Sequence, residues 1–328
     1  MKAAVVGAGV MGLATARELA RRGHDVDVYE QFELTHTRGS SHGKSRIFRL
    51  SYTEPHWIRL AQRAYELWRE LERDAGVRLL ELHGLVDAER DPGERLRAFD
   101  ECGVVHEVLR SDEARARFGF AYEDLDRVVF TPDAGISLAE DSVRAFASEA
   151  EKYGARIHPN TRVDRLDDVD AERIVVTAGG WAPKLLATAG IELAAQPTRE
   201  SIAYYALRED GVFPSLIDEV EGEQLFALAA PGVGVKAGLH HAGRETDPDE
   251  DEGPDPATVE RVSEWVSRRL PRVDPTPVHS ESCIYTNTAD TSFVCERRGR
   301  IVVGSACSGH GFKFAPAVGE LLANVAAG

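Results

Sequence analysis

The feature that most constrains this chain is a glycine-rich turn between a short strand and a helix near its start. Residues 3–6 form an apolar run, and Gly7, Gly9 and Gly12 follow with G-x-G-x-x-G spacing. Small and apolar residues then recur with helical spacing over residues 10–22. The first glycine allows the tight turn, the second lets the backbone approach a pyrophosphate, and the third lets the helix lie close to the sheet. The spacing predicts a dinucleotide site with its phosphates at the helix N-terminus.

A second strand and an acidic residue complete this unit. Val26–Tyr29 is typical of a strand, and Glu30 follows it directly. A carboxylate about 20 residues after the glycines accepts hydrogen bonds from ribose hydroxyls. Because this acid disfavours the 2′-phosphate of NADP, the ligand is FAD or NAD, and the motif alone does not distinguish them. A glycine-rich turn without a ligand is the alternative.

Length and charge bound the class of protein. At 328 residues the chain can form two domains or one large interrupted domain. Its net charge of −16 disfavours binding to nucleic acid or to an anionic membrane. Any anionic substrate must therefore be bound by a few local cations.

Several features predict a cytoplasmic protein with reduced thiols. No apolar run approaches the roughly 20 residues that cross a membrane. The first predicted strand begins almost at Met1, which leaves no room for a signal peptide. The cysteines show neither C-x-x-C spacing nor a metal-ligand pattern; they are Cys102, Cys283, Cys295 and Cys307.

A cationic loop follows Glu30. Residues 37–49 are rich in Gly, Ser, His and Arg, and they carry Lys44, Arg46 and Arg49 in an otherwise acidic protein. Cations beside a dinucleotide motif favour an anion or cofactor contact. A solvated basic loop is the alternative.

The middle of the chain alternates helices and strands. An amphipathic helix should end at Gly76. Residues 78–88 are typical of a strand with a turn at His83-Gly84. Residues 89–128 have a helical tendency and no evident chemistry. The step from a buried strand into Gly179-Gly180 would bring backbone close to a bound group, although a plain turn explains it equally well. The predicted elements here are helix 56–75, helix 141–152, strand 155–158, an extended piece from Thr161, a strand from Ile174 and helix 182–188.

From Gln196 the pattern changes to alternating strands at residues 201–207, 225–229 and 233–239, which predict an antiparallel sheet and a second domain. After an acidic loop, Asp255 should cap a helix that begins at Pro256.

A second glycine-rich loop lies near the end of the chain. A strand over residues 300–303 precedes Gly309 and Gly311, which alternate with His310 and Lys313. Open α/β sheets bind ligands at this carboxyl end of their strands. A final helix is predicted over residues 316–326.

Six segments, taken in order, resemble one family. They are the first glycine motif, Gly-Ser-Ser-His-Gly-x-x-Arg-x-x-Arg at 39–49, Val-Val-Thr-Ala-Gly-Gly-Trp at 175–181, Val-Lys-Ala-Gly-Leu-His at 235–240, Cys-Ile-Tyr-Thr at 283–286 and Ser-Gly-His-Gly-Phe-Lys-Phe at 308–314. Together they are similar to the monomeric sarcosine oxidase and N-methyltryptophan oxidase family of D-amino-acid-oxidase-like flavoproteins. The last two segments are specific to that family, whereas the first occurs in many flavoproteins.

The resemblance implies an enzyme that uses FAD to oxidise a small secondary amino acid, N-methylated or cyclic, such as sarcosine. Oxygen would be reduced to hydrogen peroxide, and the imine product would hydrolyse to an aldehyde and an amino acid or remain as a cyclic imine. The predicted partners are this substrate and oxygen, with no nucleic acid and no membrane, and the chain would be a monomer.

The resemblance also implies roles for individual residues. Cys283 would join FAD through its sulfur to the flavin 8α-methyl; taken alone, it could equally be a buried small hydrophobe. Arg49 and Lys313 would bind the substrate carboxylate and so select an amino acid over a plain amine. Arg46 and Lys236 would lie beside the flavin ring, where fixed positive charge stabilises forming superoxide.

The remaining assignments concern the pocket walls. His240 and Tyr285 match residues that line the amine pocket, and His42 matches a histidine near the flavin; a structural histidine is the alternative for each. The residues predicted to contact the cofactor are Gly7, Gly9, Gly12, Glu30, Ser41, His42, Gly179, Cys283, Gly309 and Gly311.

The predicted fold is therefore α/β, with a Rossmann-like FAD-binding domain and an antiparallel-sheet substrate domain. The FAD-binding domain should comprise residues 1–80, 130–194 and 290–328, and the substrate domain residues 81–129 and 195–289.

The chain departs from the family pattern in two places. Relatives carry aromatic pocket residues where this chain has Leu225–Ala230 with Phe226 as its nearest aromatic, and they continue with an extended segment beyond the final helix. The first departure leaves the size of the substrate open. The alternatives are an FAD-dependent dehydrogenase with another electron acceptor, an NAD-dependent dehydrogenase without flavin, or a flavin-binding protein without activity.

Overall fold

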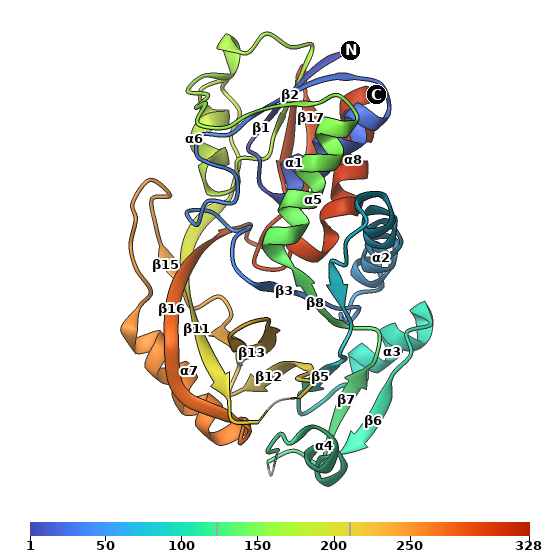
Figure 1. Ribbon diagram of the computed structural model, residues 1–328, viewed down its shortest axis with the longest axis vertical. Helices are drawn as coiled ribbons and strands as arrows, with labels where there is room; N and C mark the ends of the chain where they lie inside the picture. The colour runs from blue at the N-terminus through green and yellow to red at the C-terminus, as the bar shows by residue number, and fades with distance from the viewer. Residues whose placement is uncertain (123, 210) are drawn as a thin grey trace.

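The structure of the protein is a computed structural model, which describes residues 1–122, 124–209 and 211–328. A mostly parallel sheet with its helices forms one end of the molecule and holds both chain termini, and a curved, mostly antiparallel sheet forms the other (Figure 1). A three-stranded sheet lies between them; its strands are β3 (Ser45–Phe48), β8 (Gly135–Leu138) and β4 (Leu80–Glu81).

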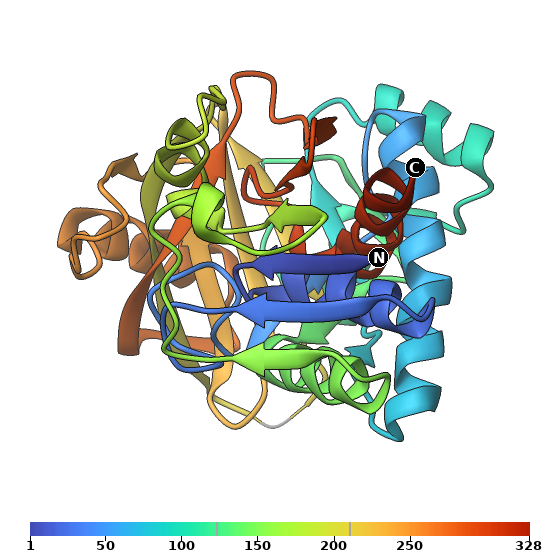
Figure 2. The ribbon, with the colours of Figure 1, turned by 90° about the horizontal axis from the view of Figure 1, so that it is seen from above.

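The first sheet has the strand order β17-β18-β10-β1-β2-β9. All its neighbouring strands pair in parallel except β17 and β18. Figure 2 shows β1, β2 and β9 side by side, as the pairing requires. The strands are β1 (Lys2–Val6), β2 (Asp25–Tyr29), β9 (Arg156–His158), β10 (Arg173–Val176), β17 (Val294–Arg298) and β18 (Ile301–Ser305).

Both faces of this sheet are covered, which explains why β1, β10 and β18 read as continuous apolar runs. Ala3 and Val5 contribute to a core with the helices on one face, while Ala4 and Val6 pack into a second cluster on the other. The helices are α1 (Val10–Arg21), α2 (Pro55–Ala75), α5 (Ala139–Lys152) and α8 (Ala315–Ala327) on the first face and α6 (Ala182–Ala187) on the second.

The large sheet runs in the order β15-β11-β14-β13-β12-β5-β7-β6, and β16 pairs with β11. Its pairs are antiparallel except for β12 with β5. The strands are β5 (Leu85–Ala88), β6 (Glu107–Arg110), β7 (Arg127–Thr131), β11 (Gln196–Leu207), β12 (Ser215–Val220), β13 (Glu223–Ala230), β14 (Gly234–Leu239), β15 (Arg244–Glu245) and β16 (Val273–Asn287).

Alternation along these strands gives the large sheet two different faces. On the outer face, Tyr205, Val235 and Ala237 pack with Trp265 of α7 (Pro256–Arg269) in an apolar core. The neighbouring residues of the same strands therefore point to the opposite face, toward the parallel-sheet end of the molecule.

Several local predictions are confirmed. The helix over residues 56–75 ends at Gly76, which has the left-handed φ of 68°. Asp255 caps α7 by accepting a hydrogen bond from the Thr258 N–H, and Pro256 is the first residue of the helix. Among the described residues, none of the helices combines the length and the apolar character that a membrane crossing requires.

Other local predictions are wrong. The single strand expected at 78–88 is two strands, β4 and β5, which belong to different sheets on either side of the turn at Gly84. The region 89–128 holds strand β6 as well as α3 (Gly93–Cys102) and α4 (Ser111–Phe118), and Thr161 begins no strand. Strand β12 had no counterpart in the sequence analysis, and the proposed domain boundaries stay a prediction.

Candidate active site

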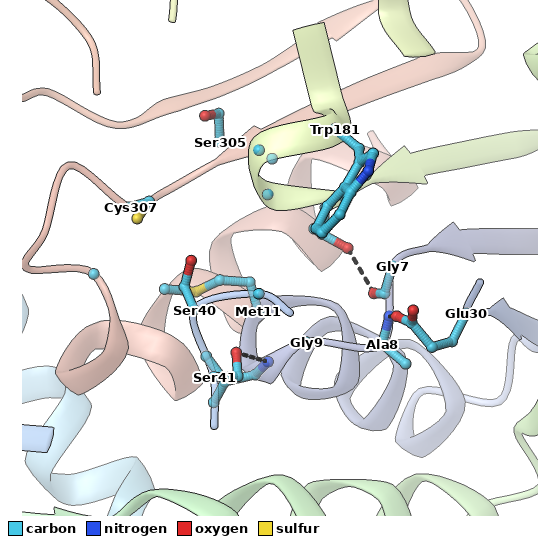
Figure 3. Close-up of a pocket in the computed structure, with 18 of the residues that line it drawn as sticks. Gly7, Ala8, Gly9, Met11, Glu30, Ser40, Ser41, Trp181, Ser305 and Cys307 are labelled. Atoms are coloured by element: carbon cyan, nitrogen blue, oxygen red, sulfur yellow. Dashed lines mark hydrogen bonds between the residues drawn. The ribbon is translucent and has the colours of Figure 1, made fainter. Parts of the chain in front are cut away.

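A cavity of about 390 Å³ lies where the carboxyl ends of the parallel strands meet the large sheet. It is the place at which open α/β sheets bind their ligands. Residues from both glycine-rich loops, from the cationic loop and from β16 line it together. Figure 3 shows Gly7, Ser41 and Cys307 among them.

The first glycine turn forms one wall of this cavity. Gly7 has a φ of 103°, and a Cβ atom there would lie 2.6 Å from the Thr177 carbonyl oxygen. A Cβ atom on Gly12 would lie only 1.9 Å from the Gly7 carbonyl oxygen, so the helix can approach the turn only with glycine at this position. The tight turn and the close approach predicted from the motif are confirmed.

The N-terminus of α1 faces the cavity. Gly9 is its N-cap residue and provides no side-chain cap, and the first turn contains no acidic residue. The Val10 N–H donates to the Ser41 Oγ at 3.1 Å, which connects the cationic loop to the helix (Figure 3). The helix dipole places partial positive charge at this N-terminus, and the N-cap residue has no side chain to occupy its N–H groups. Such an N-terminus is suited to a phosphate group.

Glu30 is fixed at the end of β2. Its Oε2 accepts a hydrogen bond from the Ala8 N–H at 2.8 Å, and its Oε1 accepts one from the Phe32 N–H at 3.0 Å (Figure 3). The side chain is buried at the cavity wall. Each carboxylate oxygen has a further lone pair, so this geometry suits hydrogen bonds from ribose hydroxyls.

The C-terminal loop closes the cavity opposite the first glycine turn (Figure 3). A Cβ atom on Gly311 would lie 1.9 Å from the Ala306 carbonyl oxygen, and one on Gly309 would lie 2.4 Å from the Tyr285 ring. Both glycines are therefore required by close packing, while Gly179 has a left-handed φ of 53° and open space around it.

Cys283 lies on β16 and lines the cavity as a free, buried thiol. Burial raises its pKa to about 11, although the positive charges of Arg46 and Lys236 act to lower it. Cys307 also lines the cavity, and its Sγ accepts a hydrogen bond from the Thr286 N–H.

Two cations share one backbone carbonyl near Cys283. The Lys236 Nζ donates to the Ser45 carbonyl oxygen at 3.1 Å, and the Arg46 Nη1 donates to the same oxygen at 2.9 Å. Lys236 is 2% exposed. Burial, together with the positive charge of Arg46, lowers the pKa of Lys236 to about 7.

Arg49 and Lys313 form a second pair of cations, and both lie near the Tyr52 ring. The Arg49 guanidinium lies 4.4 Å from the centre of the Tyr52 ring, and the Lys313 Nζ lies 5.6 Å from it. Burial, followed by the charge of Arg49, places the pKa of Lys313 well below its ordinary value. The Lys313 Nζ donates to the His310 carbonyl oxygen at 2.5 Å, and the Arg49 Nη1 donates to the Ser51 carbonyl oxygen at 2.7 Å.

Lys313 and Arg49 face different cavities. Lys313 lines the cavity just described, whereas Arg49 and Tyr52 line a second, polar cavity of about 510 Å³. Tyr52 and Arg49 are therefore placed in the second cavity, close to Lys313 of the first. Tyr52 was not among the predicted residues, although its position three residues after Arg49 on the cationic loop is a signal that could have found it.

Of the predicted histidines and tyrosine, His240 and Tyr285 lie together, whereas His42 lies near Glu281. The His240 Nδ1 is 3.3 Å from the Tyr285 hydroxyl, and burial places the pKa of His240 well below its ordinary value. His42 is 2% exposed, and neither of its ring nitrogens has a hydrogen-bond partner. Burial, followed by the charge of Arg46, lowers the pKa of His42 to about 4.

The predicted site residues divide into two groups. Those that line the first cavity are Gly7, Gly9, Glu30, Ser41, Arg46, Gly179, Cys283, Tyr285, Gly309, Gly311 and Lys313. Those that lie outside its lining are Gly12, His42, Arg49, Lys236 and His240. Their assigned roles stay predictions.

The residues present fit a dinucleotide such as FAD. A side chain at Gly7 or Gly12 would collide with the turn, the N-cap residue Gly9 supplies no side chain to the helix N-terminus, and the buried nitrogens of His42 have no partner within the described chain. Buried polar atoms are normally hydrogen-bonded, so unpaired nitrogens indicate that another group supplies the partner.

Comparison with known proteins agrees with this geometry. The family of FAD dependent oxidoreductases named DAO matches residues 2–325. Human peroxisomal sarcosine oxidase is 32% identical over 98% of this chain and 90% of its own length. Monomeric sarcosine oxidase from Streptomyces avermitilis is 32% identical over 98% of this chain and 92% of its own length.

The fold is shared with solved structures. NikD, an amino acid oxidase essential for nikkomycin biosynthesis, matches in its open form with a TM-score of 0.88 and 26% identity, covering 99% of this chain and 93% of its own. L-proline dehydrogenase from P. horikoshii, at 22% identity and a TM-score of 0.85, covers 98% of this chain and 92% of its own and shows a common fold. The predicted two-part α/β flavoprotein architecture is confirmed, and the chain belongs to the DAO family of FAD dependent oxidoreductases.

Proposed function

We propose that this protein is an FAD-dependent oxidase of a small secondary amino acid, N-methylated or cyclic, with sarcosine as the type substrate and oxygen as the electron acceptor. The observation that carries the proposal is the position of two cation pairs, each with one member, Arg46 or Lys313, in the lining of the dinucleotide cavity. Arg46 and Lys236 lie beside Cys283, and Arg49 and Lys313 surround Tyr52. The named relatives that are sarcosine oxidases support the same substrate class.

The glycine cradle, the helix N-terminus and Glu30 would hold the dinucleotide part of FAD. When bound, FAD supplies the acceptor for the two electrons that leave the substrate C–N unit. The protein contributes position and charge, because the redox chemistry belongs to the cofactor.

Arg49 and Lys313 would bind the substrate carboxylate. A guanidinium 4.4 Å and an amine 5.6 Å from the centre of one aromatic ring can both donate hydrogen bonds to a carboxylate placed near that ring. The pKa of Lys313 is lowered first by burial, so the anionic substrate would favour its protonated form and regain a paired charge. A plain amine gains neither interaction, which would make the site selective for amino acids.

His240 and Tyr285 would line the amine pocket. Because the pKa of His240 lies well below its ordinary value, its ring is neutral near pH 7 and does not repel a positively charged amine. In this account no side chain acts as the base, because the neutral form of the amine reacts directly.

Lys236 would provide the positive charge for the reaction of oxygen. Its buried position lets an ammonium group stabilise a forming superoxide more strongly than a surface lysine can. A Lys236→Met variant is expected to slow reoxidation while leaving reduction by substrate unchanged. Unchanged reoxidation would favour the alternative of a dehydrogenase with another acceptor.

The covalent attachment of FAD through the Cys283 sulfur is a finer part of the proposal. Its support is the position of the thiol in the cavity wall, near two cations that favour the thiolate. Acid precipitation tests it: flavin should stay with the wild-type pellet and be released from a Cys283→Ser variant. Cys307→Ser is the matched control, because Cys307 lines the same cavity and should retain the flavin.

The substrate class is tested by oxygen consumption with sarcosine, L-proline, glycine and methylamine. We expect turnover with the first two and much less with the primary amino acid and the plain amine. Equal rates with sarcosine and methylamine would contradict the role of the carboxylate. A monomeric state in the cytoplasm also belongs to the proposal, and sedimentation of the purified holoenzyme tests the first part.

A further inference from the structure

A carboxylate that the sequence analysis did not single out lies on the same face of the large sheet as Lys236 and Cys283. Tyr204 on β11 pairs with Lys236 on β14, and Glu200 and Ile202 on β11 pair with Cys283 and Glu281 on β16. Because side chains two residues apart share a face of a strand, Glu281, Cys283 and Tyr204 project from the same side of the sheet.

The contacts of Glu281 confirm this convergence. Its Oε1 accepts a hydrogen bond from the Tyr204 hydroxyl at 2.6 Å and lies 3.9 Å from the His42 Nε2. A Cβ atom on Gly43 would lie 3.1 Å from the Glu281 Oε1 and 3.4 Å from the Arg46 Nη1. The carboxylate and the guanidinium therefore both lie against Gly43.

Lys236 needs a counter-charge. Its ammonium group donates to a backbone carbonyl that also accepts from Arg46, so two cations share one neutral acceptor in the protein interior. A buried charge is costly unless an opposite charge compensates it. A negative charge on Cys283 or on Glu281 would raise the pKa of Lys236.

Burial raises the pKa of the Cys283 thiol to about 11, so Cys283 carries no charge near pH 7. A thioether to the flavin would be uncharged as well, which leaves Glu281 alone in this role. Although burial acts to raise the pKa of Glu281, the Tyr204 hydrogen bond and the charges of Lys236 and Arg46 lower it below its ordinary value. The carboxylate is therefore ionised near pH 7, and its side chain is 25% exposed, so it also reaches solvent.

We propose that Glu281 is the counter-ion that keeps Lys236 protonated beside the flavin, and so is a positioning residue for the reaction with oxygen. The inference rests on the proposed function, because it assumes that Lys236 assists that reaction. Glu281 would act only through Lys236 and would not contact the substrate.

The other charged and titratable groups around this cluster come from every neighbouring segment. They are His42 from the loop before β3, Arg46 from β3, Tyr204 from β11 and Cys283 from β16, with His279 stacked on Tyr204 at 4.2 Å between ring centres. His42, with a pKa lowered to about 4 by burial, is neutral near pH 7. Burial raises the pKa of Cys283 to about 11, which leaves Lys236, with its pKa lowered to about 7, as the group that titrates near neutral pH.

The test compares Glu281→Gln with Glu281→Asp in the holoenzyme. Asp274→Asn is the matched control, since it removes one carboxylate from the same strand at a position bonded to Thr276. The first readout is the pH dependence of flavin reoxidation after rapid mixing with oxygen. The second is the pH at which the flavin midpoint potential changes slope, which reports a neighbouring group that titrates without requiring turnover.

Glu281→Gln should move both transitions to lower pH. If the transition of Lys236 moves from about 7 by about one pH unit, its protonated fraction at pH 7 falls about fivefold, and reoxidation falls with it. Reduction by sarcosine should not change. Glu281→Asp should restore most of the wild-type behaviour, and Asp274→Asn should show the wild-type transitions.

The experiment distinguishes a failure of the inference about Glu281 from a failure of the proposed oxygen role of Lys236. If Glu281→Gln and Asp274→Asn share the wild-type transitions in both readouts, the inference about Glu281 is wrong. If Lys236→Met reoxidises at the wild-type rate, the oxygen role of Lys236 is wrong, while the slope of the potential still shows whether Glu281 controls the protonation of Lys236. Should Glu281→Gln fail to fold, Glu281→Ala takes its place, and transitions that stay at their wild-type pH in that variant would equally contradict the inference.

Discussion

Replacing Lys313 by Met should weaken substrate binding without destabilising the fold. Lys313 is 1% exposed, and its described hydrogen bond is to the His310 carbonyl oxygen. Burial places its pKa well below the ordinary value. In the free enzyme it is therefore a buried amine that gains little from its charge, and methionine has a similar length and shape.

The expected magnitudes follow from this environment. A hydrogen bond between charged groups contributes about 1.5–3 kcal/mol, so losing the ammonium–carboxylate contact should raise the Kd for sarcosine about 10–150-fold. Exchanging the buried amine for an apolar side chain of similar volume should leave the free energy of unfolding unchanged or raise it slightly.

Anaerobic rapid mixing measures the Kd from the dependence of flavin reduction on sarcosine concentration, and thermal unfolding measures stability. The control is Lys152→Met, a change of the same type at a lysine whose side chain is 57% exposed on α5. An unchanged Kd for Lys313→Met would refute the carboxylate role. A large loss of stability would refute the reading of Lys313 as a poorly stabilised buried amine.

Three further predictions concern the cradle, the pH dependence and the support of the site. Gly12→Ala places a Cβ atom 1.9 Å from the Gly7 carbonyl oxygen, so we expect a loss of about 1–3 kcal/mol in stability and a lower flavin content, both measured on the purified protein. Reoxidation of the flavin should slow as the pH rises through about 7, because the ammonium charge of Lys236 is present below its lowered pKa and lost above it. A reoxidation rate that rapid mixing finds constant from pH 6 to pH 9 would contradict this. Trp68→Phe removes the hydrogen bond from the indole Nε1 to the Lys313 carbonyl oxygen, and thermal unfolding should show a loss of about 1–3 kcal/mol.

The parallel-sheet unit could be predicted because its signals are local. The glycine turn, the helix after it and Glu30 all lie within the first 30 residues, and each is required by contacts among those residues or with the next strand. The caps at Gly76 and Asp255 were equally local, since one residue determines each of them.

Strand β12 could not be predicted in the same way. It pairs in parallel with β5, which is distant in the sequence, and it contains the acidic Asp218 at a fully buried position. Trp265 and Arg269 of α7 donate to the Asp218 Oδ2 at 2.7 Å and 2.8 Å, and these partners come from another part of the chain. An acidic residue within a strand does not by itself indicate which distant side chains will bind it.

The residues of the candidate site likewise divide into those with a local sequence signal and those whose partners lie far away in the sequence. The glycines and Glu30 could be assigned from spacing, whereas nothing in the sequence around Lys236 indicates that this lysine is buried. Glu281 had no signal at all, because its partners Tyr204 and His42 lie on other segments of the chain.

The most direct test of the central claim is anaerobic addition of sarcosine to the purified, flavin-containing protein, followed by readmission of oxygen. We predict that the visible flavin absorbance is bleached by sarcosine and returns with oxygen, with the release of a stoichiometric amount of hydrogen peroxide. If neither sarcosine nor L-proline bleaches the flavin, the protein is not an oxidase of small secondary amino acids.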